Sequence, residues 1–135
     1  MYGYVKVGSA VPKLRVADCV YNKEEILKLV EAAAAKQVRV LSFPELSVTG
    51  YTCADLFFQT PLLHAAEQAI QEIAEATKAL NIFLLIGAPI AVDNQMFNCA
   101  VALYKGKLLG IVPKTHIPNY SEFYEERWFA SADDL

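Results

Sequence analysis

VRVLSFPELSVTGY, residues 38–51, places an apolar run directly before a proline and a carboxylate. The run Val38–Phe43 predicts a buried strand, and Pro44 should end it because proline has no N–H to give to a strand ladder. Glu45 then lies where a strand passes into a loop, which is where the working residues of layered α/β proteins are usually found. The stretch therefore predicts both a strand and a candidate functional residue at its end.

A second strand ends in the same way. Lys107–Val112 is followed by Pro113 and then by Lys114, so a base stands where the first strand has an acid. Neighbouring parallel strands bring their ends together at one edge of a sheet, and we therefore expect Glu45 and Lys114 to share a site. A carboxylate beside an ammonium suits one general base and one cation that stabilises an oxyanion. The two residues by themselves provide no nucleophile.

Composition narrows the class of protein. The 135 residues fit one domain with a real core and no internal boundary. The apolar fraction of 55% and the mean hydropathy of +0.27 predict a sheet buried on both faces, or surface meant for a partner. A net charge of −3 and a pI of about 5.3 argue against nucleic acid or an anionic membrane as partner. The apolar runs are too short to span a bilayer and the first residues lack a signal-peptide pattern, so we expect a cytoplasmic protein.

The remaining pattern alternates strands with helices, which predicts an α/β layered fold with a mixed sheet. One helix is expected after an Asn22 N-cap, and a second is expected to open at Pro61, where the missing N–H costs nothing. The second helix carries one buried stripe, Leu63, Ala66, Ile70, Ile73, Thr77 and Leu80. The expected elements are strands at Tyr4–Val7, Leu14–Ala17, Val38–Phe43 and Ile82–Ala88, a helix at Lys23–Lys36, and a hairpin of Phe97–Tyr104 with Lys107–Val112.

Cysteines and histidines give no metal site. Cys19, Cys53 and Cys99 have no C-x-x-C spacing, and His64 and His116 are far apart. Cys53 is a weak nucleophile candidate, because a small neutral cysteine is more often a packing residue. Cys19 and Cys99 are predicted to lie in the core and His64 on the surface, while His116 is predicted to be either a loop residue or one that supports the site from behind. No glycine-rich phosphate loop is present, so we expect no cofactor on this chain.

Four stretches of the sequence resemble motifs of a known family. Phe43–Tyr51 resembles the glutamate motif of the nitrilase (carbon–nitrogen hydrolase) superfamily, and Pro113–Tyr120 resembles its lysine motif. The extensions Gly50–Gln59 and Asn119–Phe129 are similar to the glutaminase domain of glutamine-dependent NAD synthetases. The resemblance covers essentially the whole chain. It implies that residues 1–135 are the N-terminal portion of a nitrilase-like α-β-β-α sandwich, a partial glutaminase domain.

The resemblance also implies roles for individual residues. Glu45 matches the general base and Lys114 the oxyanion-stabilising cation of a Glu–Lys–Cys triad, whose thiolate attacks the side-chain amide of glutamine and releases ammonia. Glu125 matches a second glutamate that orients the lysine and the amide. Tyr51 and Tyr120 match loop tyrosines near the glutamine pocket.

The chain departs from the family pattern in three respects. The nucleophilic cysteine of the family lies several tens of residues beyond the lysine, and we expect it after Leu135. The synthetase domain, which uses ATP and Mg²⁺ to amidate deamido-NAD, is also expected outside this chain. Tyr124 stands where the family pattern leads us to expect an aspartate. We therefore expect an N-terminal fragment that is inactive alone, forms homo-oligomers and works on glutamine together with a C-terminal synthetase domain.

Two alternatives remain open at this point. The chain could belong to another nitrilase-type amidase with a different amide substrate. It could also be a non-catalytic assembly module that kept the fold without the chemistry.

Overall fold

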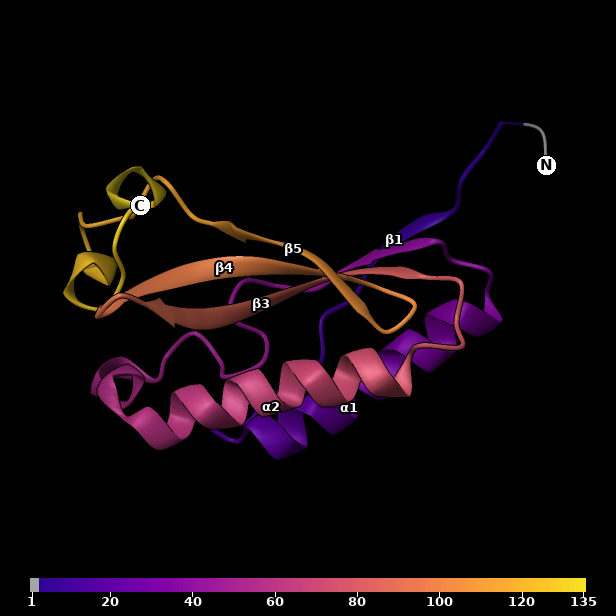
Figure 1. Cartoon of the computed structure of the whole chain (residues 1–135), viewed down its shortest axis with the longest axis horizontal. Helices are drawn as coiled ribbons and strands as arrows, with labels where there is room; N and C mark the ends of the chain where they lie inside the picture. Colours follow the sequence, from indigo (N-terminus) through magenta and orange to yellow (C-terminus); the bar gives the residue numbers. More distant parts are fainter. Residues whose placement is uncertain (1–2) are drawn as a thin grey trace.

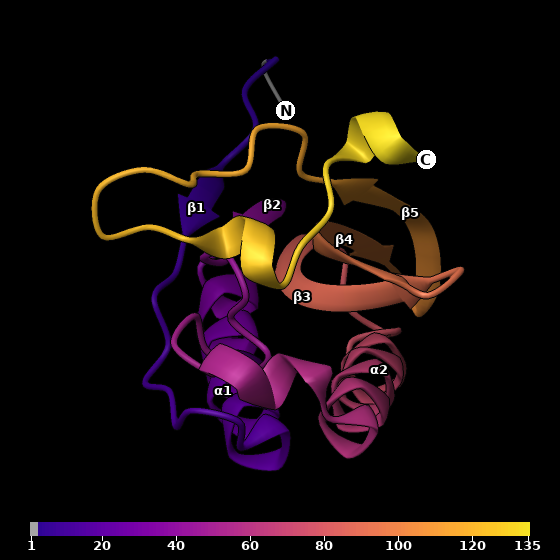
Figure 2. The same cartoon turned by 90° about the vertical axis from the view of Figure 1, so that its left-hand side faces the viewer.

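Two helices lie side by side against one face of a five-stranded sheet in the computed structural model, which describes residues 3–135 (Figure 1, Figure 2). The strands are ordered β1-β2-β3-β4-β5 across the sheet. Their bounds are β1 Val7–Ser9, β2 Val40–Ser42, β3 Phe83–Val92, β4 Gln95–Tyr104 and β5 Lys107–Pro113. The helices are α1 Cys19–Ala35 and α2 Thr60–Ala76, and the short 3₁₀ turns are η1 Ala54–Phe58, η2 Glu125–Arg127 and η3 Ala132–Asp134.

The sheet is mixed, as predicted. β1, β2 and β3 run parallel, while β3, β4 and β5 form an antiparallel meander. The strands β2 and β5 are not neighbours, because β3 and β4 lie between them. Two reversals of direction leave β5 parallel to β2, so both strands still end at the same edge of the sheet. The predicted shared edge is therefore confirmed, but by a different route from the one expected.

The helix α1 begins one turn before its predicted start. The cap is Asp18, whose Oδ1 accepts a hydrogen bond of 3.0 Å from the N–H of Tyr21. Asn22, the predicted cap, lies inside the helix and is fully buried. Its side chain bonds to both the N–H and the C=O of Arg15 and to the C=O of Val48. An asparagine before a helical pattern was a reasonable cap, but tertiary partners outside the helix engage it instead.

The helix α2 follows its prediction closely. Pro61 stands in the first turn, as its missing N–H allows. The predicted stripe faces the sheet, with Ala66, Ile70, Ile73 and Thr77 buried. Leu63 and Leu80 are only partly buried against the same core, while Leu62 is buried beside them. No helix in the described part of the chain is long and apolar enough to cross a membrane.

Two strand predictions near the N-terminus are wrong. Residues 14–17 form no strand, because the side chain of Asn22 takes the backbone groups of Arg15 that a ladder would need. The first strand lies at Val7–Ser9 and overlaps the predicted Tyr4–Val7 only at Val7. The strand predicted over Val38–Phe43 is shorter at both ends, and the predicted hairpin turns at Lys105 and Gly106.

The second face of the sheet carries apolar side chains without a covering helix among residues 3–135 (Figure 2). Leu84 and Ile86 are buried on the helix side, so strand alternation points Leu85 to the other face. Its partner there is Ala102, and Val112 lies exposed on the same face. The sheet face opposite the helices is thus partly apolar and exposed, in line with the expectation of surface meant for a partner.

Candidate active site

Glu45 stands on a tight turn that leaves the end of β2. The ladder continues to Phe43, whose N–H donates to Leu85 at 2.9 Å, and Pro44 then ends it. Leu46, which follows Glu45, has a positive φ of 53° although it is fully buried. A non-glycine residue in this conformation costs about 1–3 kcal/mol and is kept only where the surroundings enforce it. Here the C=O of Leu46 accepts from the N–H of Gly50 at 2.7 Å, which closes the turn.

The turn packs directly against the backbone of β3 at Gly87. A Cβ at this position would lie 2.3 Å from the N of Leu46, 2.6 Å from the O of Pro44 and 2.9 Å from the carbonyl carbon of Glu45. The C=O of Gly87 also accepts a hydrogen bond of 3.1 Å from Val48. Only glycine allows this approach. The lack of a side chain at Gly87 therefore lets the turn that carries Glu45 lie directly against β3.

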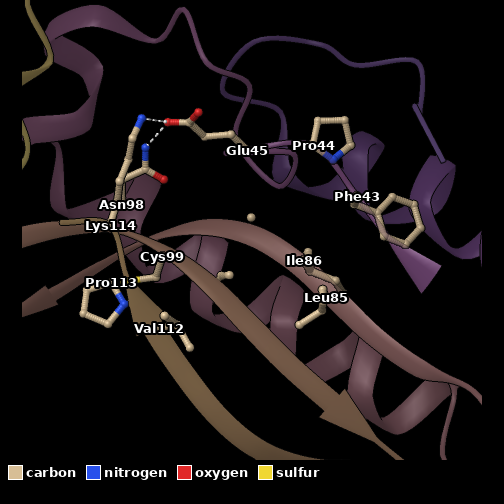
Figure 3. Close-up of a pocket in the computed structure, with 12 residues that line it drawn as sticks. Phe43, Pro44, Glu45, Leu85, Ile86, Asn98, Cys99, Val112, Pro113 and Lys114 are labelled. Atoms are coloured by element: carbon tan, nitrogen blue, oxygen red, sulfur yellow. Dashed lines mark hydrogen bonds and ion pairs between the residues drawn. The ribbon is translucent and has the colours of Figure 1, made fainter. Parts of the chain in front are cut away.

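Lys114 reaches Glu45 from the end of β5. Its Nζ lies 2.8 Å from Oε1 of Glu45, and Figure 3 shows the two side chains meeting above the sheet. Its backbone N–H donates to the C=O of Asn98 at 2.8 Å, which extends the β4–β5 pairing by one residue. A pocket of about 340 Å³ opens beside the pair, lined by the turn after β2, by the middle of β3 and β4 and by the end of β5. The sequence prediction that these two residues meet is confirmed.

Glu125 is the third charged member of the site. Its Oε2 lies 3.2 Å from Nζ of Lys114, and its Oε1 accepts a hydrogen bond of 2.7 Å from the hydroxyl of Tyr51. The side chain is only 3% exposed. Its backbone is fixed as well, because its N–H donates to Pro118 and its C=O accepts from Phe129. Both the side chain and the backbone of Glu125 are therefore hydrogen-bonded, although Tyr124 and not an aspartate precedes it.

Burial and the acidic side chains of the site shift the pKa values of the Lys114 ammonium and the Tyr51 phenol. Partial burial lowers the pKa of the Lys114 ammonium, but its hydrogen bonds and charge interactions with Glu45 and Glu125 outweigh burial and raise the pKa above its usual value. Burial and the hydrogen bond to Glu125 both raise the pKa of the Tyr51 phenol. At neutral pH the site therefore holds an ammonium on Lys114 and a neutral phenol on Tyr51, whose hydroxyl donates to Glu125.

Asn98 completes the contacts of Glu45 and was missed from the sequence. Its side-chain N–H₂ donates to Oε1 of Glu45, the same oxygen that Lys114 contacts (Figure 3). A polar residue inside the apolar run of β4 was a visible signal, since a buried amide needs a partner. The sequence could not name that partner, because β4 and the Glu45 turn are far apart along the chain.

An ion-pair clamp holds the segment that carries Glu125. Asp55, in η1, accepts from Nε and a terminal nitrogen of Arg127 at 2.7 and 2.8 Å, and from the indole of Trp128 at 3.0 Å. Below it the ring of Phe129 packs edge-on against Phe57 at 5.0 Å. The hydrogen bonds from Arg127 and then from Trp128 lower the pKa of Asp55 from 3.8 to about 2. The clamp ties the loop after Glu45 to η2.

The clamp predicts a pH-dependent stability. A carboxyl whose pKa is lowered on folding stabilises the protein above its unfolded pKa, and this contribution is lost as the pH falls through the folded pKa. In the full-length protein, Asp55→Asn should therefore lower the unfolding midpoint near neutral pH. The difference from wild type should shrink as the pH falls from 3.8 to about 2. Urea unfolding over this range measures it, with Asp93→Asn in the β3–β4 turn as the matched control. A constant difference at all pH values would contradict the clamp.

The other candidates from the sequence lie outside the charged cluster. Tyr120 is exposed, and its ring packs against Phe123 at 6.0 Å rather than against Lys114. Cys53 is buried, its thiol donates to the C=O of Thr49 at 3.3 Å, and burial raises its pKa.

Cys19 and Cys99 are buried as predicted, and burial raises the pKa of each thiol to about 11. His64 and His116 are exposed. Within residues 3–135, no group of three or more His, Cys, Asp and Glu side chains is placed to hold a metal ion.

Comparison with known proteins agrees with the fold and the site. The carbon–nitrogen hydrolase family model matches residues 6–134. A glutamine-dependent NAD(+) synthetase of Mycobacterium leprae (strain TN) is 36% identical over 132 residues, which are 98% of this chain and 19% of that protein. The crystal structure of a glutamine-dependent NAD(+) synthetase from Cytophaga hutchinsonii superposes with a TM-score of 0.89 at 30% identity, over 94% of this chain and 22% of that one.

An amidase from Nesterenkonia sp. shares the fold, with a TM-score of 0.74 at 22% identity over 92% of this chain and 47% of that one. The chain thus spans about a fifth of the length of the curated synthetases it matches, where 19% of the Mycobacterium leprae protein is covered. The family match extends over nearly all of the described residues and includes the turn of Glu45 and the end of β5. This chain belongs to the carbon–nitrogen hydrolase family.

Proposed function

We propose that this chain is the N-terminal part of the glutaminase domain of a glutamine-dependent NAD synthetase. The observation that carries the proposal is the meeting of Glu45, Lys114 and Glu125 at one sheet edge, with Nζ of Lys114 at 2.8 Å from Glu45 and 3.2 Å from Glu125. The similarity to synthetases over 98% of the chain supports glutamine as the amide substrate.

Each charged group takes one role in this proposal. Within residues 3–135, the hydrogen bonds to Glu45 all go to Oε1, which leaves Oε2 to accept a proton as general base. Lys114 stabilises the negative charge that develops on the amide oxygen. Glu125 holds the ammonium of Lys114 in place, and Tyr51 fixes Glu125 from the other side. Tyr120 is proposed to contact glutamine from the loop after Lys114.

The nucleophile in this proposal is a cysteine of the longer protein, because Cys19, Cys53 and Cys99 are buried with raised thiol pKa values. Its thiol gives a proton to Glu45 and its sulfur attacks the side-chain carbonyl carbon of glutamine. The proton then leaves with the amide nitrogen as ammonia, and a glutamyl thioester remains. Water cleaves the thioester, with Glu45 taking a proton from the water and returning it to the departing thiolate, so glutamine and water give glutamate and ammonia.

Further partners of this site are also proposals. Ammonia from the site would serve the ATP-dependent amidation of deamido-NAD in a synthetase domain, which would bind the ATP and Mg²⁺. The apolar face of the sheet opposite the helices supports contacts with other parts of the longer protein or with further copies of it. We propose a homo-oligomer on this ground.

Ammonia release from the purified full-length protein tests the function. Glutamine, asparagine and small aliphatic amides are supplied in separate reactions, and ammonia and the acid product are measured. We expect release from glutamine that Glu45→Gln abolishes and that Glu67→Gln, on the exposed side of α2, leaves unchanged. Turnover of small amides but not glutamine would point to another nitrilase-type amidase. A folded protein that hydrolyses none of them would indicate an assembly module.

A further inference from the structure

Asn98 contacts both members of the Glu45–Lys114 pair from one strand. Its side-chain N–H₂ donates to Oε1 of Glu45, and its backbone C=O accepts from the N–H of Lys114 at 2.8 Å. The residue is only 3% exposed, although its neighbours Phe97 and Cys99 are apolar and also buried. A buried amide in such surroundings is costly unless its partners are fixed.

The strand that carries Asn98 is among the best-anchored parts of the sheet. β4 pairs with β3 along its whole length, from Phe83 with Tyr104 to Val92 with Gln95, and pairs with β5 on its other side. The turn of Glu45, by contrast, leaves the sheet after a strand of three residues, and its Glu45 side chain is 41% exposed. Asn98 therefore connects a partly exposed carboxylate to a strand that is paired on both sides.

The contact also decides which oxygen of Glu45 stays open. Lys114 and Asn98 both bind Oε1, so the carboxylate plane is fixed by two donors on the same atom. An amide donor does this without adding a second positive charge beside Lys114. A half-turn would only exchange the two equivalent oxygens, but a smaller rotation would break both contacts and turn the open oxygen away from its present direction.

We propose that Asn98 is a positioning residue: its amide N–H₂ directs Oε2 of Glu45 toward the proton it takes up, while its C=O sets the place of Lys114. The inference rests on the proposed amide hydrolysis for its kinetic consequence. Asn98 itself does not touch the substrate in this role. Its geometric consequence, the orientation of Glu45, holds whatever amide is hydrolysed.

Variants of the full-length protein test this role. Asn98→Leu keeps the approximate size and removes the donor, and Asn98→Asp keeps the shape but replaces the donor by an acceptor facing Glu45. We expect both to lower kcat by about 10²-fold, the effect of a catalytic group displaced by about 1 Å, while KM changes little. A lowered kcat at an unchanged KM in the folded protein is a result that a loss of folding stability alone would not give.

Thr77→Val is the matched control, since Thr77 is also buried and its hydroxyl donates to Ile73 at 2.8 Å, in the turn that ends α2. Thr77→Val should lower the unfolding midpoint while leaving kcat of the folded fraction near wild type. Crystal structures of wild type and Asn98→Leu give a readout independent of turnover, and should show the Glu45 carboxylate rotated away from Lys114. An unmoved carboxylate, or a wild-type kcat in Asn98→Leu, would overturn the role of Asn98. A wild-type protein inactive on every amide, with the carboxylate rotated as expected, would instead refute only the proposed function.

Discussion

Replacing Lys114 by methionine in the full-length protein is expected to lower kcat for glutamine hydrolysis by about 10²–10³-fold, the usual loss when one group that stabilises an oxyanion is removed. Methionine keeps much of the side-chain length but has no charge. The change also removes the cation from Glu125, whose carboxylate is 3% exposed and would be left with the Tyr51 hydroxyl as its side-chain partner among the described residues. A buried charge without a counter-ion is strongly destabilising, so the unfolding midpoint should fall as well.

The loss of activity and the loss of stability can be separated. Lys23→Met is the matched control, because Lys23 is also largely shielded and pairs with Glu72 and Glu24, but on the helical layer away from the site. It should destabilise the protein while leaving kcat of the folded fraction near wild type. The double variant Lys114→Met/Glu125→Gln should recover part of the stability but none of the activity. Full activity in folded Lys114→Met would remove Lys114 from the chemistry.

Replacing Gly87 by alanine should have the next largest effect, although the residue carries no functional group. A Cβ would stand 2.3 Å from the backbone N of Leu46 and 2.6 Å from the O of Pro44, closer than atoms can pack. Neither neighbour is a flexible side-chain end, so the whole Glu45 turn must shift. We expect about 1–3 kcal/mol of destabilisation from overpacking, and about a 10²-fold loss in kcat from moving Glu45 by about 1 Å.

Gly110→Ala provides the control within the same sheet. Gly110 lies in β5, and a Cβ there would meet no atom within 4 Å. The replacement should leave kcat unchanged and should not destabilise the protein, since alanine also restricts the unfolded chain more than glycine does. Urea unfolding and glutamine turnover, measured side by side on both variants, make the comparison. Equal behaviour of the two variants would show that the close approach at Gly87 does not position Glu45.

Local patterns predicted most of the elements because they depend on periods of two and of 3.6 residues that need no distant partner. The strand before Pro44, the helix at Pro61 and the hairpin through Gly106 are all found near their predicted places. The errors arose where a distant partner competed with a local signal. Asn22 looked like a helix cap but bonds to Arg15 and Val48, and the same contacts prevent a strand at residues 14–17.

The candidate site divides in the same way. Glu45 and Lys114 were found together from the sequence, because each follows a strand and a proline, and Glu125 and Tyr51 were found through a family resemblance. Tyr120 stays a prediction, since in this structure it contacts Phe123 and not the charged cluster.

By itself, the sequence determined which strands end in charged residues and that the fold is a layered α/β fold. Strand ends and the apolar stripes of helices depend only on residues that are close together in the sequence. Only the tertiary structure decided that β3 and β4 lie between β2 and β5, that Gly87 admits the Glu45 turn, and that Asn98 binds Oε1 of Glu45. These features depend on distances between residues of different strands. Such distances follow from the register and twist of the whole sheet, which no short stretch of the chain specifies.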